Sequence, residues 1–107
     1  MLGWLDHFHT ALESAVAGGP PSLDEVAHHL ALSPRTLQRR LREEGTSWRE
    51  ELENLRQRRV ERLLQETQLT MDAIATRVGF SDSRSLRRAI HRWYGHGPAA
   101  IRTHGPA

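Results

Sequence analysis

Apolar residues recur at intervals of three and four along most of the chain, the spacing that gathers side chains on one face of a helix. The alternation of polar and apolar positions that marks a strand is missing from the sequence. A last short helical turn is predicted from Gly97-Pro98 to Ile101. The other helices are expected over residues 4–17, 22–31, 33–44, 47–66, 70–78 and 83–94. The pattern therefore predicts an all-α chain of about seven helices.

Capping residues mark where these helices should begin and end. Ser22 with Glu25, and Ser47 with Glu50, have the spacing of a capping box. Ser33-Pro34 supplies a cap followed by proline at the first helical position, and Thr70 is a further cap. Helix-stopping glycines or glycine–proline runs follow at residues 18–21, 45, 79 and 95.

The apolar positions of each predicted helix define an expected core. The first helix carries one stripe that should cover the following helix pair, although the same stripe could instead face a further domain of a longer protein. The tail from Thr103 onward is expected to fray. The expected core positions are Leu5, Phe8, Leu12, Val16, Val26, Ala27, Leu30, Leu37, Leu41, Trp48, Leu52, Leu55, Val60, Leu63, Leu64, Ile74, Ala75, Val78, Leu86, Ala89, Ile90, Trp93 and Tyr94.

The chain contains an internal repeat. Residues 22–33 match residues 70–81 at an offset of 48, and the next helix matches at an offset of 49, with the extra residue in the turn. Each copy reads as helix, tight turn, helix, with the small Ala27 or Ala75 where two helices must approach closely. This is the helix-turn-helix plan, whose second helix enters the major groove of DNA.

The predicted organisation is two helix-turn-helix subdomains joined by one long linking helix. A linking helix of about 30 Å is close to the roughly 34 Å that separates successive major-groove faces, so one chain could read two adjacent segments. The expected parts are an N-terminal helix with a Gly/Pro linker (1–21), the first helix-turn-helix (22–46), the linking helix (47–69), the second helix-turn-helix with a short terminal helix (70–103) and a tail (104–107).

Charge is distributed unevenly along the chain. The net charge of +2 conceals four acids and no Arg or Lys within residues 1–33, whereas the other 74 residues carry +6. All fifteen basic residues are arginine, whose planar guanidinium makes paired hydrogen bonds to phosphate and to guanine. The basic part of the chain is the part expected to contact a polyanion.

Several classes of function are disfavoured by the sequence. The absence of cysteine excludes disulfides, cysteine-ligated zinc and thiol catalysis, and suits a cytoplasmic protein. No secretory signal and no apolar run of membrane-spanning length is present. The histidine clusters His7/His9 and His28/His29 lack metal-ligand spacing, and no nucleophile motif occurs. We therefore expect no enzyme, no cofactor, no metal and no membrane partner.

Three motifs resemble the AraC family of bacterial transcription regulators. They are Leu-Ser-Pro-Arg-Thr-Leu-Gln-Arg at 32–39, Ile-Ala-Thr-Arg-Val-Gly-Phe-Ser at 74–81 and Tyr-Gly-His-Gly-Pro-Ala-Ala-Ile-Arg at 94–102. The resemblance implies a DNA-binding domain of a longer activator or repressor, with both recognition helices in the major groove. One departure is Gln57-Arg58-Arg59, where the family usually has an apolar residue in the linking helix.

The resemblance also implies roles for individual residues. Phosphate contacts, which hold the protein in register, are assigned to Thr36, Arg40, Arg42, Arg87 and Arg92. Arg56 is open between a DNA contact and an internal salt bridge that ties the linking helix to a neighbour. Base edges are assigned to Arg35, Gln38 and Arg39 of the first recognition helix and to Ser83, Arg84, Ser85 and Arg88 of the second.

The expected partner is double-stranded DNA, and the fragment alone is expected to be monomeric. RNA polymerase is a candidate further partner of the full-length protein. The alternative is a helical protein-interaction module whose arginine-rich faces bind an acidic partner. A steep dependence of affinity on salt would favour DNA over that alternative.

Overall fold

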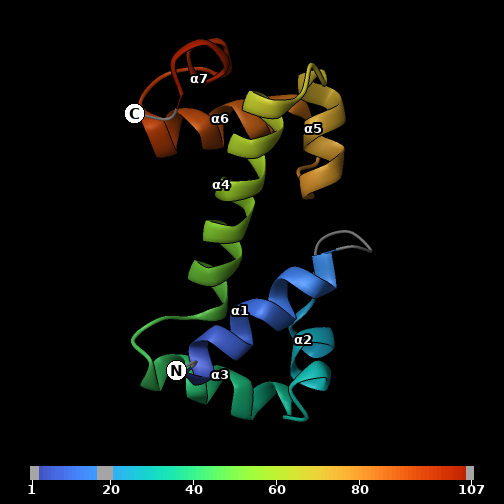
Figure 1. Ribbon diagram of the computed structural model, residues 1–107, viewed down its shortest axis with the longest axis vertical. Coiled ribbons are helices and arrows are strands. Elements are labelled where there is room, and N and C mark those ends of the chain that lie inside the picture. Colours follow the sequence, from blue (N-terminus) through green and yellow to red (C-terminus); the bar gives the residue numbers. More distant parts are fainter. Residues whose placement is uncertain (1–2, 17–20, 106–107) are drawn as a thin grey trace. The chain divides into compact units, whose positions relative to one another are not determined.

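The computed structural model describes residues 3–16 and 21–105, and these residues form helices and no strand. The helices are α1 (Trp4–Ala15), α2 (Leu23–His29), α3 (Pro34–Glu43), α4 (Trp48–Glu66), α5 (Met71–Val78), α6 (Ser83–Tyr94) and α7 (Pro98–His104), shown in Figure 1. The predicted all-α class is confirmed. None of the described helices has the length and apolar character needed to cross a membrane.

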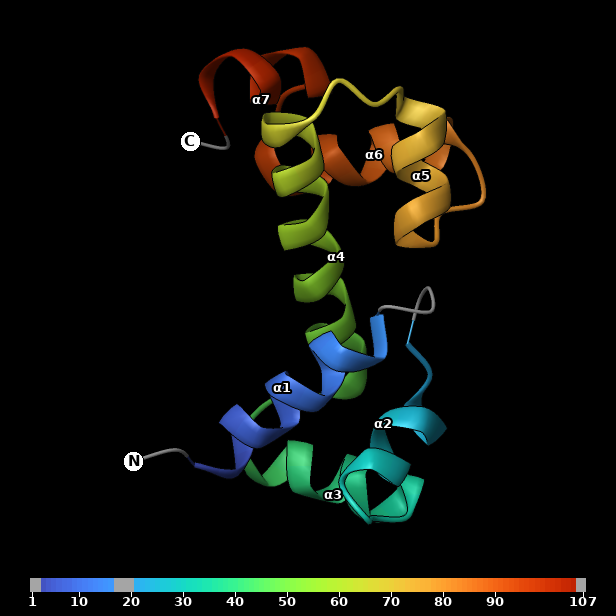
Figure 2. The same ribbon diagram turned by 45° about the vertical axis from the view of Figure 1, so that its right-hand side comes forward.

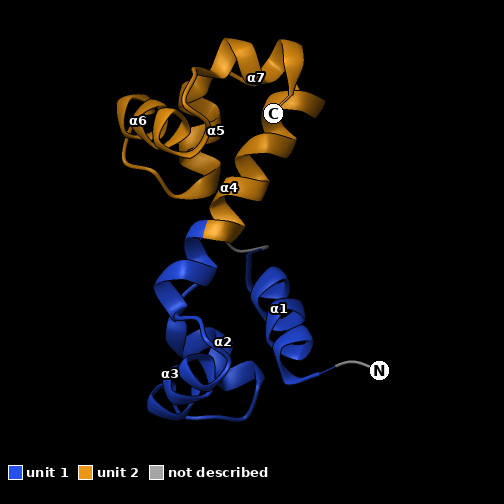
Figure 3. Ribbon diagram, turned by 90° about the vertical axis from the view of Figure 1, so that its left-hand side faces the viewer, with its two compact units in different colours: residues 1–53 blue, residues 54–107 orange. Residues whose placement is uncertain are grey.

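The chain divides into two compact units, residues 1–53 and 54–107, and the division falls inside α4 (Figure 3). Unit 1 contains α1, the helix pair α2 and α3, and the start of α4. Unit 2 contains the rest of α4, the pair α5 and α6, and α7. Each unit thus holds one copy of the predicted repeat.

In unit 1 the helix pair is covered by α1. Phe8 and Leu12 of α1 are fully buried, and Ala11 and Ala15 extend the same face, whereas Leu5 is only half-buried. From α2 and α3 the buried apolar side chains are Val26, Ala27, Leu37 and Leu41. Burial of one phenylalanine or leucine side chain stabilises a fold by roughly 1.5–3 kcal/mol. Because α1 contributes two such side chains, Phe8 and Leu12, it is part of this core. Of the predicted helix stop at residues 18–21, residues 18–20 lie outside the described residues.

One buried acid fixes α1 to the beginning of α4. Glu51 is 8% exposed, and its Oε1 lies 2.6 Å from Nε2 of His9 on α1. The other carboxylate oxygen accepts a hydrogen bond from the Thr46 hydroxyl at 2.7 Å. Both oxygens are therefore partnered, which offsets the cost of taking the carboxylate out of water. The ring of Phe8 also meets that of Trp48 edge to face.

In unit 2 the second half of α4 and the C-terminal α7 take part in the core around α5 and α6 (Figure 2). Leu63, Trp93 and Tyr94, which the pattern placed in the core, are partly buried and pack against it. The fully or nearly buried members are Val60, Leu64, Ile74, Ala75, Val78, Leu86, Ile90 and Ile101.

The end of α4 is closed by an arginine that the sequence had left without a role. Nη1 of Arg102 donates to the carbonyl oxygens of Thr67, at 2.7 Å, and of Leu64, and its Nη2 donates to that of Leu69. The last carbonyls of a helix have no partner within the helix, so this guanidinium satisfies groups that would otherwise be unpaired. The expectation of fraying from Thr103 was wrong for the part described, because α7 continues to His104.

The turn within each helix pair has the same geometry. Leu32 N–H donates to Ala27 O, and Phe80 N–H donates to Ala75 O, both at 2.9 Å. The residue in front of each donor is left-handed: Ala31 has φ 58° and Gly79 has φ 87°. The two residues are related by the offset of 48, so the repeat seen in the sequence is a repeat of backbone structure.

Exchanging the residue types at this turn position should have opposite effects. Left-handed backbone costs a residue with a Cβ atom roughly 1–2 kcal/mol relative to glycine. We expect Gly79→Ala to lower the free energy of unfolding by about 1 kcal/mol or more. Ala31→Gly should raise it by only about 0.5 kcal/mol, because the relief of left-handed strain is partly offset by the larger entropy that glycine loses on folding. Urea unfolding measures both. A stabilising Gly79→Ala would contradict the geometry of this turn.

Candidate nucleic-acid interface

The first predicted recognition helix, α3, is capped and oriented by its own sequence. The Ser33 hydroxyl accepts from Thr36 N–H at 3.1 Å and donates to the Thr36 hydroxyl at 2.9 Å, and Pro34 begins the helix. Leu37 and Leu41 are fully buried, so the opposite face points to solvent. The exposed side chains of that face are Arg35, Gln38, Arg39 and Arg42.

Three of these arginines surround a shallow concavity. Arg35, Arg39 and Arg42 line it together with the half-buried Thr36. Guanidinium groups arranged around a concave surface favour an anionic partner, because the positive potential is strongest where the groups converge. The structure thus brings together four of the residues that the sequence assigned to base or phosphate contacts.

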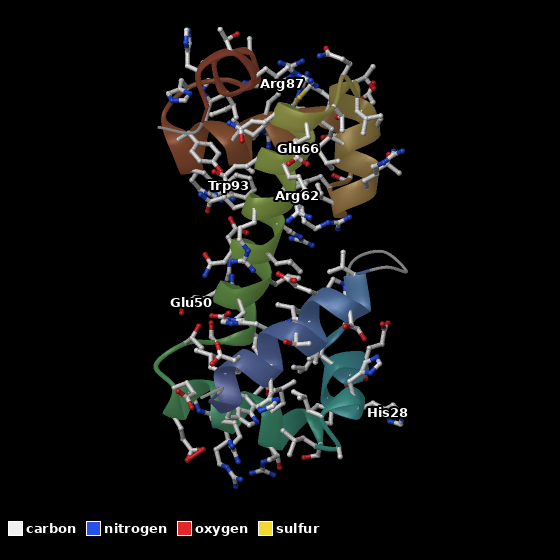
Figure 4. The ribbon with its side chains drawn as sticks, viewed as in Figure 1. His28, Glu50, Arg62, Glu66, Arg87 and Trp93 are labelled. Carbon is white, nitrogen blue, oxygen red and sulfur yellow. The ribbon has the colours of Figure 1, made fainter. Side chains whose placement is uncertain are left out.

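The second predicted recognition helix, α6, follows the same plan with a different cap. Asp82 Oδ1 accepts from Ser85 N–H at 2.7 Å, and the Ser85 hydroxyl lies 3.3 Å from that of Ser81. Leu86, Ala89 and Ile90 are buried. Arg87 and Trp93 extend from different sides of the helix (Figure 4). The exposed arginines are Arg84, Arg87, Arg88 and Arg92, and Ser83 and Ser85 are half-buried.

The offset of 49 places the two recognition helices in register. Arg35 pairs with Arg84, Thr36 with Ser85, and Arg39 with Arg88, so these positions keep both chemistry and place on the helix. Gln38 pairs with Arg87, although the sequence assigned the first to bases and the second to phosphate. The two assignments give different roles to positions that the repeat makes equivalent.

Arg40 lies apart from the exposed face of α3. Its guanidinium carbon is 4.8 Å from the centre of the Trp4 ring, and the side chain is half-buried. The equivalent residue of α6 is Ala89, which is buried. Arg40 therefore packs under α1 at a position where the other repeat needs only a methyl group, and the cation–π contact keeps its charge at the edge of the core.

Arg56, which the sequence left between two roles, is placed against the second repeat. Its guanidinium carbon lies 5.5 Å from the centre of the ring of Phe80, a residue of the turn that joins α5 to α6. Arg56 therefore links α4 to a neighbouring element, and its partner is an aromatic ring.

Among the described residues, no group of three or more His, Cys, Asp or Glu is placed to hold a metal ion.

Comparison with known proteins agrees with this geometry. A family model described as a helix-turn-helix domain matches residues 26–104. An uncharacterized HTH-type transcriptional regulator of Mycobacterium tuberculosis is 39% identical over 85 residues, which cover 79% of this chain and 25% of the relative. This chain belongs to the AraC-type helix-turn-helix family.

Solved structures place the fold in the same AraC-type family. A regulator with an AraC-type DNA-binding domain from Chromobacterium violaceum has a TM-score of 0.78 at 25% identity, over 94% of either chain. The DNA-binding domain of AdpA, solved in complex with a target DNA, has a TM-score of 0.72 at 27% identity, over 90% of this chain and 89% of that one. This chain spans about a quarter of the length of the curated relatives that head the comparison.

Two features of this AraC-type domain were not found from the sequence. Asp82 was read as part of the turn, although aspartate directly before a helix is a strong capping signal. The Ser85 backbone N–H, then the Ser85 hydroxyl, and then Arg84 and Arg88 hold the pKa of the Asp82 carboxyl below its usual range. The contact of Trp4 with Arg40 had no sequence signal, because it joins residues 36 positions apart.

The unusual middle of α4 is matched by a polar group on α6. Val60 is fully buried and Arg59 half-buried there, and burial followed by the nearby Arg62 lowers the pKa of Arg59. Burial raises the pKa of Tyr94 to about 12, with the side chains of Gln57 and Glu61 beside its hydroxyl. The polar residue at 57 is therefore placed where α4 meets a phenol.

Tyr94 offers a direct test of this packing, because it is the only tyrosine in the chain. We expect tyrosinate absorbance to appear with a midpoint near pH 12 in the folded protein, and near 10 in denaturant. A raised folded pKa means that the stabilisation is fully present below pH 10 and is lost as the pH rises towards 12. Equal midpoints in both conditions would contradict burial of the phenol.

Proposed function

We propose that this chain is the DNA-reading domain of a bacterial transcription regulator, with α3 and α6 each entering a major groove. One observation carries the proposal: two helices related by an internal repeat bury their leucine faces and expose matched arginine faces. The family membership supports it, and so does the relative AdpA, whose DNA-binding domain was solved with a target DNA. The proposed role is binding and not catalysis.

Base reading is proposed for exposed or half-buried residues near the start of each recognition helix. Arg35, Gln38 and Arg39 on α3, and Ser83, Arg84, Ser85 and Arg88 on α6, are the candidates. Arginine pairs with guanine O6 and N7, and glutamine with adenine, so both half-sites should favour guanine. The equivalence of Gln38 and Arg87 supports a groove-facing place for Arg87 as well.

Phosphate contacts are proposed for the flanking residues Thr36, Arg40, Arg42, Arg87 and Arg92. Exposure supports Arg42 and Arg92 in this role. Arg40 is held against Trp4, so any phosphate it meets must lie at the flank of α3 that faces α1. For Arg87, the repeat supports a place in the groove, whereas the family resemblance supports a contact with the DNA backbone. Substitution of Arg87 would separate the two roles.

The remaining functions belong to the longer regulator that the relatives' lengths suggest. We propose that the full-length protein acts in the cytoplasm as an activator or repressor, that its contacts with RNA polymerase and any effector involve further segments, and that this domain alone is monomeric. Each of these properties is separable from DNA reading by the domain.

The first experiment is selection of duplexes from a random pool by the purified chain at near-physiological salt. Two short enriched blocks about one helical turn apart are expected if both repeats read bases. A single block would remove the second recognition helix from the proposal. Absence of enrichment, together with a shallow salt dependence, would replace DNA with an acidic protein partner.

Substitution should separate base reading from phosphate contact. Arg39→Ala should weaken binding to the selected duplex by about 1–3 kcal/mol and relax the base preference at one position of the site. Arg42→Ala should weaken binding to all duplexes alike and reduce the magnitude of the slope of log affinity against log salt by about 0.9. Arg58→Ala removes an exposed arginine of α4 with no assigned role and serves as the charge-matched control. Identical behaviour of all three variants would refute the site assignment.

A further inference from the structure

The two recognition helices differ in the charge of the residue that caps them. Ser33 caps α3 with a neutral hydroxyl, whereas Asp82 caps α6 with a carboxylate. Both accept a hydrogen bond from the backbone N–H three residues later, Thr36 in one repeat and Ser85 in the other. Because serine already performs the capping task in this chain, the cap alone does not require a negative charge at residue 82.

The carboxylate of Asp82 is exposed, and it lies near the arginines of its own recognition face. Arg84 and Arg88 both act electrostatically on it, and they are the two arginines proposed to read bases on α6. The hydrogen bonds from Ser85 and these two guanidinium groups keep the pKa of the carboxyl below its usual range, so it is charged at physiological pH. An acid thus stands among the groups that must approach a polyanion.

We propose that Asp82 is a specificity-determining residue that penalises non-specific DNA binding by α6 more than it penalises the correct site. The proposal rests on the proposed function and concerns a residue for which no DNA role was assigned above.

The penalty arises because non-specific complexes are held by arginine–phosphate contacts. In such a complex, Asp82 competes with phosphate for Arg84 and Arg88 and repels the backbone itself. At the correct site these arginines turn to base edges, where the carboxylate can orient them, and an acid can also accept a hydrogen bond from the amino group of cytosine. The negative charge of Asp82 therefore weakens complexes held by phosphate contacts alone more than complexes in which Arg84 and Arg88 contact bases.

Exchange of the caps between the two repeats tests the proposal. Asp82→Asn and Asp82→Ser keep a residue able to cap the helix and remove the charge, and Ser33→Asp places the charge in the first repeat. The affinity of each protein is measured for the selected duplex and for a scrambled duplex of equal length, at two salt concentrations. The temperature of unfolding is measured alongside, to verify that each cap is retained.

Removal of the charge is expected to strengthen binding to the scrambled duplex by about threefold or more, the size of one charge interaction near water, with a smaller gain or a loss on the selected duplex. The ratio of the two affinities should fall in both Asp82 variants and rise in Ser33→Asp. The differences should shrink at high salt, because exposed charges are then screened.

Equal changes on both duplexes, or none, in well-folded Asp82 variants would overturn the proposal and leave Asp82 as a cap only. Should Asp82→Ser unfold, Asp82→Asn and Ser33→Asp still decide the question, since asparagine caps as well as aspartate. A wild-type chain that fails to distinguish the selected from the scrambled duplex would instead refute the proposed function, so the two failures are distinguishable.

Discussion

The structure depends on the close packing of two helices in each repeat, made possible by one alanine. Ala27 and Ala75 are about 1% exposed, and in each repeat the second helix packs its Leu37 or Leu86 into the same small core. A larger residue at either alanine would push the helices apart, because cores of this density do not absorb an extra methylene without strain. Once the inner face of α3 or α6 is fixed in this way, its outer face is fixed too.

The two units complete this small core by different means. In unit 1, α1 supplies Phe8 and Leu12 and is held by the hydrogen bond between His9 and Glu51. In unit 2, the second half of α4 and α7 supply the cover, and Arg102 joins the two. Two short helices bury too little apolar surface to fold alone, so each pair requires such an added layer. The two repeats therefore share the left-handed residue that begins the turn, whereas different elements cover each helix pair.

Most of the fold could be predicted from the sequence, because its signals are local. The caps at Ser22, Ser33 and Thr70, and the helical spacing of the leucines, each involve residues within a few positions of one another. The repeat then supplied the pairing of helices, since two copies of one pattern must have the same partners. The apolar stripe of α1 predicted a cover for the first pair, with a further domain as the alternative, and the buried alanines of α1 were overlooked.

The parts that could not be predicted involve contacts distant in sequence. Arg102 donates hydrogen bonds to carbonyls 33 to 38 residues away, and Arg40 contacts the ring of Trp4. Nothing in the sequence around these two arginines distinguishes them from the exposed arginines. An arginine on an amphipathic helix has the same pattern whether its end reaches solvent, a ring or a helix terminus. For the same reason the sequence predicts the interface as a face of α3 and α6, while the base and phosphate roles assigned to individual residues within it stay predictions.

Folding and the proposed reading of DNA involve nearly separate sets of residues. Leu37 and Leu86 hold the recognition helices, while exposed arginines such as Arg39 and Arg88 contribute little to stability because water screens them. Relatives can therefore keep the fold while they change the exposed face, which fits the 39% identity of one of them. Asp82 is proposed to belong to both sets, because its carboxylate caps the start of α6 and its charge interacts with Arg84 and Arg88. A substitution of Asp82 therefore changes both the helix cap and the charge beside the arginines, unless the replacement residue can also cap the helix.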